Sequence, residues 1–196
     1  MVTPAQPAVV KAILRRAAIV RRDALPAAER QQAAETIAAR AFPVAVPPGA
    51  IVSGFMPLKS EINPLPLLRK LAAAGAQLAL PVVDGKGKPL IMRGWTFGGP
   101  LASGVWGIRE PMADAPKVDP DILIVPLLAF DRRGHRLGYG AGYYDMTLTA
   151  LRARKPIVAV GIAHAAQEVD TVPITPRDAR LDLVLTEREI IDFRSV

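Results

Sequence analysis

The sequence predicts an α/β fold in which a mainly parallel sheet is flanked by helices in a three-layer domain. Short apolar runs alternate with segments of helical periodicity, which is the order that strand–helix–strand units produce. The run 122–125 is apolar at every position, as is typical of a strand covered on both faces. Because the 196 residues contain no repeat and no low-complexity linker, we expect one domain spanning residues 1–196.

The chain is expected to open with a helical hairpin, because helical periodicity extends over 8–24 and 27–41 and Leu25-Pro26 interrupts it. The later elements are expected in this order: a strand at 50–55, a helix at 64–74 that ends at Gly75, strands at 77–83, 91–95 and 122–125, a helix at 142–153, and strands at 156–161 and 181–185. The segment 97–120 is rich in Gly, Pro and Trp, which predicts a long loop with little regular structure.

Composition narrows the possible functions. The 25 basic and 18 acidic residues give a formal net charge of +7, which favours an anionic partner unless the excess is only a solvated surface. Cysteine is absent, which excludes disulfides, thiolate nucleophiles and cysteine metal sites. The longest apolar run, 122–130, is less than half of the ~20 residues that a membrane helix needs, so no membrane partner is expected.

The first predicted helix carries a cationic edge. At 100° per residue Lys11, Arg15 and Arg22 fall within about 40° of one another, beside an apolar arc. No acidic residue precedes Asp23, a pattern that is also found in organelle transit peptides, but the stretch lacks serine. We therefore favour a helix of the mature protein, and we expect a cytoplasmic location.

The stretch DRRGHRLGYGAGYYD (131–145) follows the apolar run and lies at the carboxyl end of a predicted strand, where ligands of such sheets usually bind. Glycines at 138, 140 and 142 permit backbone amides to converge on a phosphate. The alternative is a tight loop in which glycine serves geometry alone. The spacing matches neither the Walker pattern nor the dinucleotide fingerprint.

The neighbours of these glycines favour a Mg²⁺-nucleotide site. Arg136 precedes them, Tyr143 and Tyr144 follow, and Asp145 lies near the start of the predicted helix. A guanidinium neutralises phosphate oxygens, tyrosines stack or donate hydrogen bonds, and a carboxylate holds magnesium. Asp145 has an alternative role, which is to stabilise the helix N-terminus electrostatically.

Two further residues suit the recognition of a heterocycle. Glu61 in MPLKSEIN (56–63) has the carboxylate to bind an amide edge, and Trp106 in GVWGIREP (104–111) has the face to pack on a ring. The competing interpretations are a surface glutamate and a core tryptophan.

The segments LLAFDRRGHRLGYGAGYYD, KAILRR and MPLKSEIN together resemble the 5-formyltetrahydrofolate cyclo-ligase family, also called 5,10-methenyltetrahydrofolate synthetase. The resemblance implies ATP-dependent closure of 5-formyltetrahydrofolate to 5,10-methenyltetrahydrofolate, with release of ADP and phosphate. It implies phosphorylation of the formyl oxygen, attack by N10, and Mg²⁺ as cofactor. The expected partners are therefore small molecules, with no nucleic acid, and the expected state is a monomer.

The resemblance also implies roles for individual residues. Those implied in catalysis are Arg136 and Tyr143, and those implied in magnesium binding are Asp145 and Asp182. Those implied in ATP binding are Lys11, Arg15, Arg136, Leu137, Gly138, Tyr139, Gly140, Ala141, Gly142, Tyr143 and Tyr144. Those implied in folate binding are Met56, Glu61, Trp106, Tyr139 and Tyr143.

Two loop positions depart from the family pattern. Tyr139 and Ala141 stand where some members carry Arg and Lys, so either Arg132 or Arg133 compensates or nucleotide affinity is lower. A related enzyme that acts on another substrate is therefore one alternative function. The other is a basic nucleic-acid-binding protein, although the chain has no interleaved aromatic residues and no recognised nucleic-acid module.

Overall fold

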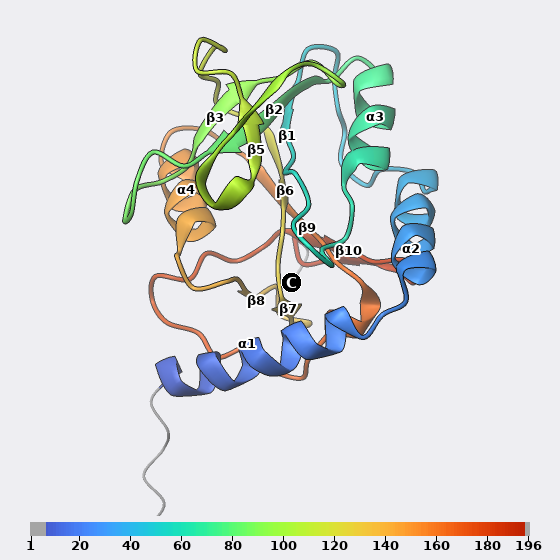
Figure 1. Ribbon diagram of the computed structural model, residues 1–196, viewed down its shortest axis with the longest axis vertical. Coiled ribbons are helices and arrows are strands. Elements are labelled where there is room, and N and C mark those ends of the chain that lie inside the picture. Colours follow the sequence, from blue (N-terminus) through green and yellow to red (C-terminus); the bar gives the residue numbers. More distant parts are fainter. Residues whose placement is uncertain (1–6, 195–196) are drawn as a thin grey trace, which may run out of the picture.

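The structure is a computed structural model that describes residues 7–194, and a mostly parallel sheet lies at its centre (Figure 1). Within these residues the large sheet has the strand order β11-β10-β9-β6-β1-β2-β3. Neighbours from β10 to β2 pair in parallel, whereas the edge strands β3 and β11 are antiparallel to theirs. The strands span Ile51–Ser53 (β1), Gln77–Val82 (β2), Ile91–Gly94 (β3), Ile122–Val125 (β6), Val158–Ile162 (β9), Leu183–Leu185 (β10) and Ile190–Asp192 (β11). The predicted fold class is confirmed.

Strand β6 shows why both faces of the sheet are covered. Because successive side chains point to opposite faces, Ile122 and Ile124 join one buried cluster and Leu123 and Val125 join another. Helices α2 (Ala27–Ala39) and α3 (Leu65–Ala73) pack into the first cluster, and α4 (Tyr143–Arg152) packs into the second. In Figure 1 these helices lie on opposite sides of the strands, which gives the predicted three layers.

Helix α1 (Pro7–Asp23) lies below the strands in Figure 1, across the carboxyl edge of the sheet. Its Ala18 is buried against Leu128 and Leu137 in a separate small cluster. The two N-terminal helices are therefore consecutive but contact different parts of the fold, since α2 packs on α3 and the sheet. The buried residues of α1 are Lys11, Ala18 and Arg22, whereas its apolar Val9, Ile13 and Val20 are exposed.

The segment 97–120 is more regular than we predicted. Strands β4 (Leu101–Ser103) and β5 (Arg109–Pro111) form an antiparallel hairpin, and a short 3₁₀ helix, Val105–Gly107, makes its turn. Strands of three residues are too short for a reliable alternation pattern. For the same reason the sequence did not reveal β7 (Ala129–Phe130), just before the glycine-containing stretch, or β8 (Arg136–Leu137), inside it; the two strands pair with each other.

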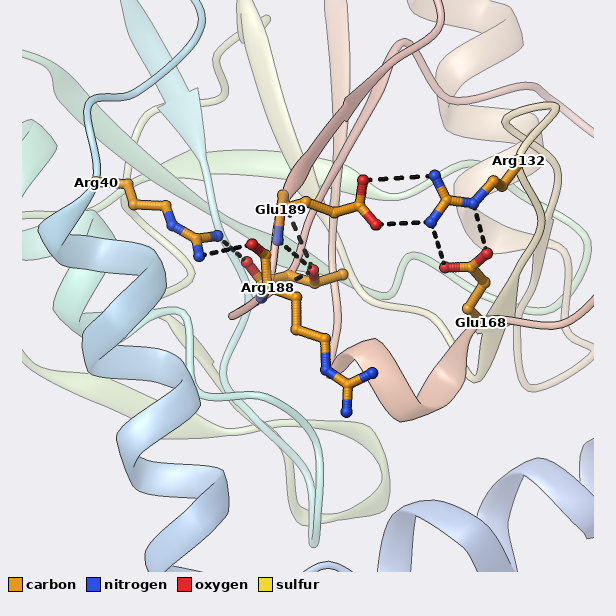
Figure 2. Close-up of polar contacts among 6 residues, drawn as sticks. Arg40, Arg132, Glu168, Arg188 and Glu189 are labelled. Carbon is orange, nitrogen blue, oxygen red and sulfur yellow. Dashed lines mark hydrogen bonds and ion pairs between the residues drawn. The ribbon is translucent and has the colours of Figure 1, made fainter.

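Two arginines stabilise the turn between β10 and β11 (Figure 2). Arg40, just after α2, donates hydrogen bonds to the backbone carbonyls of Thr186 at 2.6 Å and Arg188 at 2.9 Å. Arg132 pairs with Glu168 at 2.7 Å and with Glu189 at 2.6 Å. Arg132 therefore contributes to the surface around this turn.

In the part of the chain that the structure describes, no helix is long and apolar enough to cross a membrane.

Candidate functional site

Four segments that are distant in sequence meet at the carboxyl edge of the sheet. Helix α1 contacts the stretch 138–140 through Arg15 and Arg22, and Arg22 also contacts the segment that follows β1. The β4–β5 turn reaches the start of α4 through an aromatic contact. Most of the residues predicted to bind nucleotide and folate are therefore brought to one place.

Lys11 and Arg15 point from α1 toward this edge. The Lys11 Nζ is 2.5 Å from Oδ2 of Asp178, and both side chains are largely buried. The Arg15 Nε donates a hydrogen bond of 2.9 Å to the Gly138 carbonyl. Burial raises the pKa of Asp178, but hydrogen bonds from Lys11 and Thr175 outweigh that effect and lower the pKa overall. Asp178 is therefore an ionised partner of Lys11 that the sequence pattern did not indicate.

The three loop glycines differ in what the fold requires of them. Gly140 (φ 106°) and Gly142 (φ 71°) have positive φ, which favours glycine, and the Arg15 guanidinium lies 3.2 Å from where a Cβ on Gly140 would be. Gly138 does not have positive φ, and apart from its two chain neighbours no atom of residues 7–194 lies within 4 Å of the position of an added Cβ. Loop geometry explains glycine at 140 and 142, but it does not explain glycine at 138.

Arg136 connects β8 to the first turn of α4. Its Nη2 donates to Oδ1 of Asp145 at 2.8 Å, and its Nη1 donates to the Ala179 carbonyl at 2.5 Å. The Ala179 amide donates to the same Asp145 oxygen at 3.0 Å. Burial lowers the pKa of Arg136, and the neighbouring Asp145 carboxylate opposes this shift. The carboxylate thus has one oxygen occupied, while its Oδ2 makes no hydrogen bond within residues 7–194.

Asp145 and Asp182, the predicted magnesium ligands, lie at opposite ends of α4. Asp145 is in the first turn, next to the carboxyl edge of the sheet. Asp182 precedes β10, and its Oδ2 accepts hydrogen bonds from the Ala159 amide at 2.7 Å and from Arg152, in the last turn of α4, at 2.9 Å. The structure does not bring the two together. The described chain holds no group of three or more acidic or histidine side chains that could hold a metal ion.

Trp106 and Tyr143 form an aromatic pair beside the loop. Their ring centroids are 6.1 Å apart with an interplanar angle of 56°. Trp106 is 65% exposed, so it is not a core tryptophan, and its φ of 58° is unusual for a bulky residue. Strained backbone of this kind clusters at ligand-binding sites. Met56 is half-buried in the segment after β1.

Glu61 is not an ordinary surface glutamate. Its Oε2 accepts a hydrogen bond from the Leu58 amide, and its Oε1 accepts one from the Tyr139 hydroxyl, each at 2.8 Å. Burial raises the pKa of Glu61, and these two hydrogen bonds partly offset that effect. The Tyr139–Glu61 contact joins the loop predicted to bind nucleotide to the segment predicted to bind folate.

The cation that lies next to Tyr139 is Arg22, rather than the residues we considered from the sequence. Its Nη1 donates to the Tyr139 hydroxyl at 2.8 Å. Arg132 is engaged by two glutamates, and Arg133 pairs with Asp131 at 3.0 Å. The sequence placed Arg22 on the same edge of the helix as Lys11 and Arg15. It did not indicate that Arg22 contacts Ser60 and Tyr139.

Comparison with known proteins identifies the family. The model of the 5-formyltetrahydrofolate cyclo-ligase family matches residues 7–187. The chain belongs to this family. It is 34% identical over 192 residues to the 5-formyltetrahydrofolate cyclo-ligase of Mycolicibacterium smegmatis, covering 94% of this chain and 97% of that one. It is 33% identical over 181 residues to the Escherichia coli K12 enzyme of the same name, covering 88% and 98%.

A solved structure of another cyclo-ligase family member has the same fold. The 5,10-methenyltetrahydrofolate synthetase of Aquifex aeolicus superposes with a TM-score of 0.78 at 28% identity, covering 94% of this chain and 93% of that one. The synthetase of Mycoplasma pneumoniae, at 23% identity and a TM-score of 0.71, covers 90% and 98% and supports the fold. The resemblance inferred from the sequence is confirmed, as is its assignment to an enzyme family.

Proposed function

We propose that this member of the cyclo-ligase family converts 5-formyltetrahydrofolate to 5,10-methenyltetrahydrofolate at the carboxyl edge of the sheet, with conversion of ATP to ADP and phosphate. The observation that carries the proposal is the 2.8 Å hydrogen bond between Tyr139 and Glu61. This hydrogen bond supports the proposal because it joins the loop that we propose for phosphate to the carboxylate that we propose for the heterocycle. The two substrates would therefore bind side by side, as transfer of a group between them requires.

The chemistry explains why phosphorylation precedes ring closure. The formyl oxygen is amide-like and leaves poorly, whereas transfer of the γ-phosphoryl group of ATP converts it into a phosphate ester. Attack by N10 of the folate on the formyl carbon closes the ring, and phosphate then departs with the former formyl oxygen. Such reactions need positioning and charge neutralisation from the protein more than covalent participation.

Cationic side chains supply the neutralisation in this proposal. Lys11 pairs with Asp178, and Arg136 pairs with Asp145. These ion pairs hold the two cationic side chains at the carboxyl edge of the sheet before a nucleotide binds. Arg15 fixes the loop through the Gly138 carbonyl. Because no described residue other than the chain neighbours lies within 4 Å of where a Gly138 side chain would begin, a phosphate oxygen can approach the backbone closely there.

Magnesium fits this site through Asp145. Its Oδ2 is free of hydrogen bonds within the described chain, and Mg²⁺ is usually held by one or two carboxylates together with substrate phosphates and waters. The ion would supply additional neutralisation of phosphate charge. Asp182 stays a predicted ligand from the resemblance, but its position at the amino edge supplies no second oxygen beside Asp145.

The folate would bind against the residues on the other side of Tyr139. Glu61 would accept hydrogen bonds from the amide edge of the pterin, and Trp106 and Tyr143 offer aromatic faces for its ring. Met56 lies in the same segment as Glu61 and would contribute apolar contact.

One assay tests the proposal directly. Purified protein incubated with 5-formyltetrahydrofolate and MgATP should produce the near-ultraviolet absorbance of the methenyl product, with ADP formed in equal amount. Omitting ATP or magnesium should prevent the reaction. Absence of the absorbance across a range of pH and substrate concentration would refute the assignment.

A further inference from the structure

Arg22 is a buried cation at the end of α1. Its side chain is 1% exposed, its Nε donates to Ser60 Oγ at 3.0 Å, and its Nη1 donates to the Tyr139 hydroxyl at 2.8 Å. Within residues 7–194 it forms no ion pair with a carboxylate. Burying a guanidinium is unfavourable unless its donors find partners. The Tyr139 hydroxyl is therefore a substantial part of what makes this buried position acceptable.

The directions of the hydrogen bonds in this network are fixed by chemistry. A guanidinium only donates and an ionised carboxylate only accepts. The Tyr139 hydroxyl must therefore accept from Arg22 and give its single proton to Oε1 of Glu61, at 2.8 Å on each side. Tyr139 thus bridges the positive charge of Arg22 and the negative charge of Glu61.

This bridge occupies the carboxylate that would receive the substrate. The donor on Oε2 of Glu61 is the backbone amide of Leu58, so Oε1 is the oxygen whose present donor, the Tyr139 hydroxyl, can move away for a substrate donor. We propose that Arg22 and Tyr139 form a latch on Glu61, and that a folate must displace the Tyr139 hydroxyl from Oε1 before it can bind. This proposal rests on the function proposed above and assigns Tyr139 a specificity-determining role within it.

The structure provides a way for the latch to open. Tyr139 is 48% exposed and lies between Gly138 and Gly140, so its side chain can leave Oε1 through local rotation of the loop. Arg22 remains anchored to Ser60 and can stay in place. Because these hydrogen bonds stabilise the state in which Tyr139 occupies Oε1, folate affinity is reduced by the free energy needed to break the Tyr139–Glu61 contact.

The Tyr139→Phe variant tests the latch because it removes the hydroxyl and keeps the ring. We expect this variant to bind 5-formyltetrahydrofolate about ten- to a hundredfold more tightly than the wild type, as loss of one competing hydrogen bond to a charged group predicts. Isothermal titration calorimetry without ATP measures this affinity. The KM for the folate should fall by a similar factor. Thermal unfolding checks that the variant folds, and Tyr139→Leu, which also lacks the hydroxyl, gives a second measurement.

A double-mutant cycle with Glu61→Ala supplies the control. If Tyr139 acts through Glu61, removing its hydroxyl should have no effect on folate affinity once Glu61 is gone. A purely structural role would instead change the unfolding temperature without tightening binding. Unchanged or weaker binding by an active Tyr139→Phe enzyme overturns the latch alone. A wild-type protein that does not turn over the folate overturns the proposed function and the latch with it.

Discussion

Alanine substitutions at Gly138 and Gly142 distinguish two roles of glycine in this loop. We expect glycine at 142 to be required by the backbone conformation, and glycine at 138 to be required by the bound nucleotide. Gly142, with φ 71° and ψ 11°, lies in the left-handed region, where an L-residue costs about 1–2 kcal/mol. For a chain of this length each 1 kcal/mol shifts Tm by about 2–4 °C, so Gly142→Ala should lower Tm by about 2–8 °C. At Gly138 an added methyl group meets no atom of the described residues within 4 Å apart from its chain neighbours, so the free energy of unfolding should change by no more than about 0.5 kcal/mol.

For ATP binding we expect the larger effect from the substitution at Gly138. A methyl group on residue 138 enters the space that we assign to a phosphate oxygen, and small displacements of a reacting group reduce rates by up to about a hundredfold. We expect Gly138→Ala to raise the KM for ATP about tenfold or more. Thermal unfolding by circular dichroism and the ATP dependence of methenyl formation measure the two effects. If Gly138→Ala lowers Tm as Gly142→Ala does and leaves the KM unchanged, the glycine serves loop geometry alone.

Three other substitutions address the site and its support. Lys11→Ala should raise the KM for ATP about tenfold or more, as expected for a lost charge-assisted hydrogen bond; an unchanged KM in steady-state assays removes Lys11 from the site. Because burial raises the pKa of Glu61 above the ordinary 4.5, kcat/KM for the folate should fall as the pH drops through a value above 4.5. A pH profile of Glu61→Gln should lack that limb, and its persistence would assign the ionisation to another group. Asp131 is fully buried and accepts hydrogen bonds from the amides of Arg133, at 2.9 Å, and Val172, at 3.0 Å. The Asp131→Asn substitution should therefore lower the free energy of unfolding by about 3 kcal/mol. Urea titrations at neutral pH measure this loss. A loss below 1 kcal/mol contradicts this role.

The acid dependence of the Asp131 effect has a defined sign. Burial raises the pKa of Asp131, but hydrogen bonds from Val172, Arg133 and His135 outweigh it, so the pKa lies below 3.8 in the folded protein. The stabilisation is therefore complete well above pH 3.8 and is lost as the pH falls through the lowered value. The difference between the wild type and Asp131→Asn should narrow in that range.

The central sheet was predictable because its strands are apolar on both faces. Strand β6 (Ile122–Val125) is buried at every position, and helices α3 and α4, which cover opposite faces of the sheet, have clear apolar periodicity. The sequence did not reveal the β4–β5 hairpin or the β7–β8 pair, because strands of two or three residues are too short to show an alternation. Such elements are determined by pairing with each other across a short turn rather than by an apolar pattern of their own.

For the site, local spacing predicted the residues that share one element. Lys11 and Arg15 are four residues apart on α1 and both reach the predicted edge. The partners were not predictable, because Asp178 is 167 residues from Lys11 and nothing in its own surroundings indicates an ion pair. Likewise, the loop departure at Tyr139 was visible in the sequence, but its contact with Arg22 depends on how α1 crosses the sheet.

The ion pair of Lys11 with Asp178 also bears on how the protein is made. Ribosomes synthesise chains at about 5–20 residues per second, so the 167 residues between the two take roughly 10–30 s to add. Throughout that interval the first helix lacks its acidic partner, and for most of it the helix also lacks Leu128 and Leu137, on which its Ala18 packs. The first helix to be synthesised must therefore be among the last to dock, and a nascent chain can complete most of its sheet before it has a working active site.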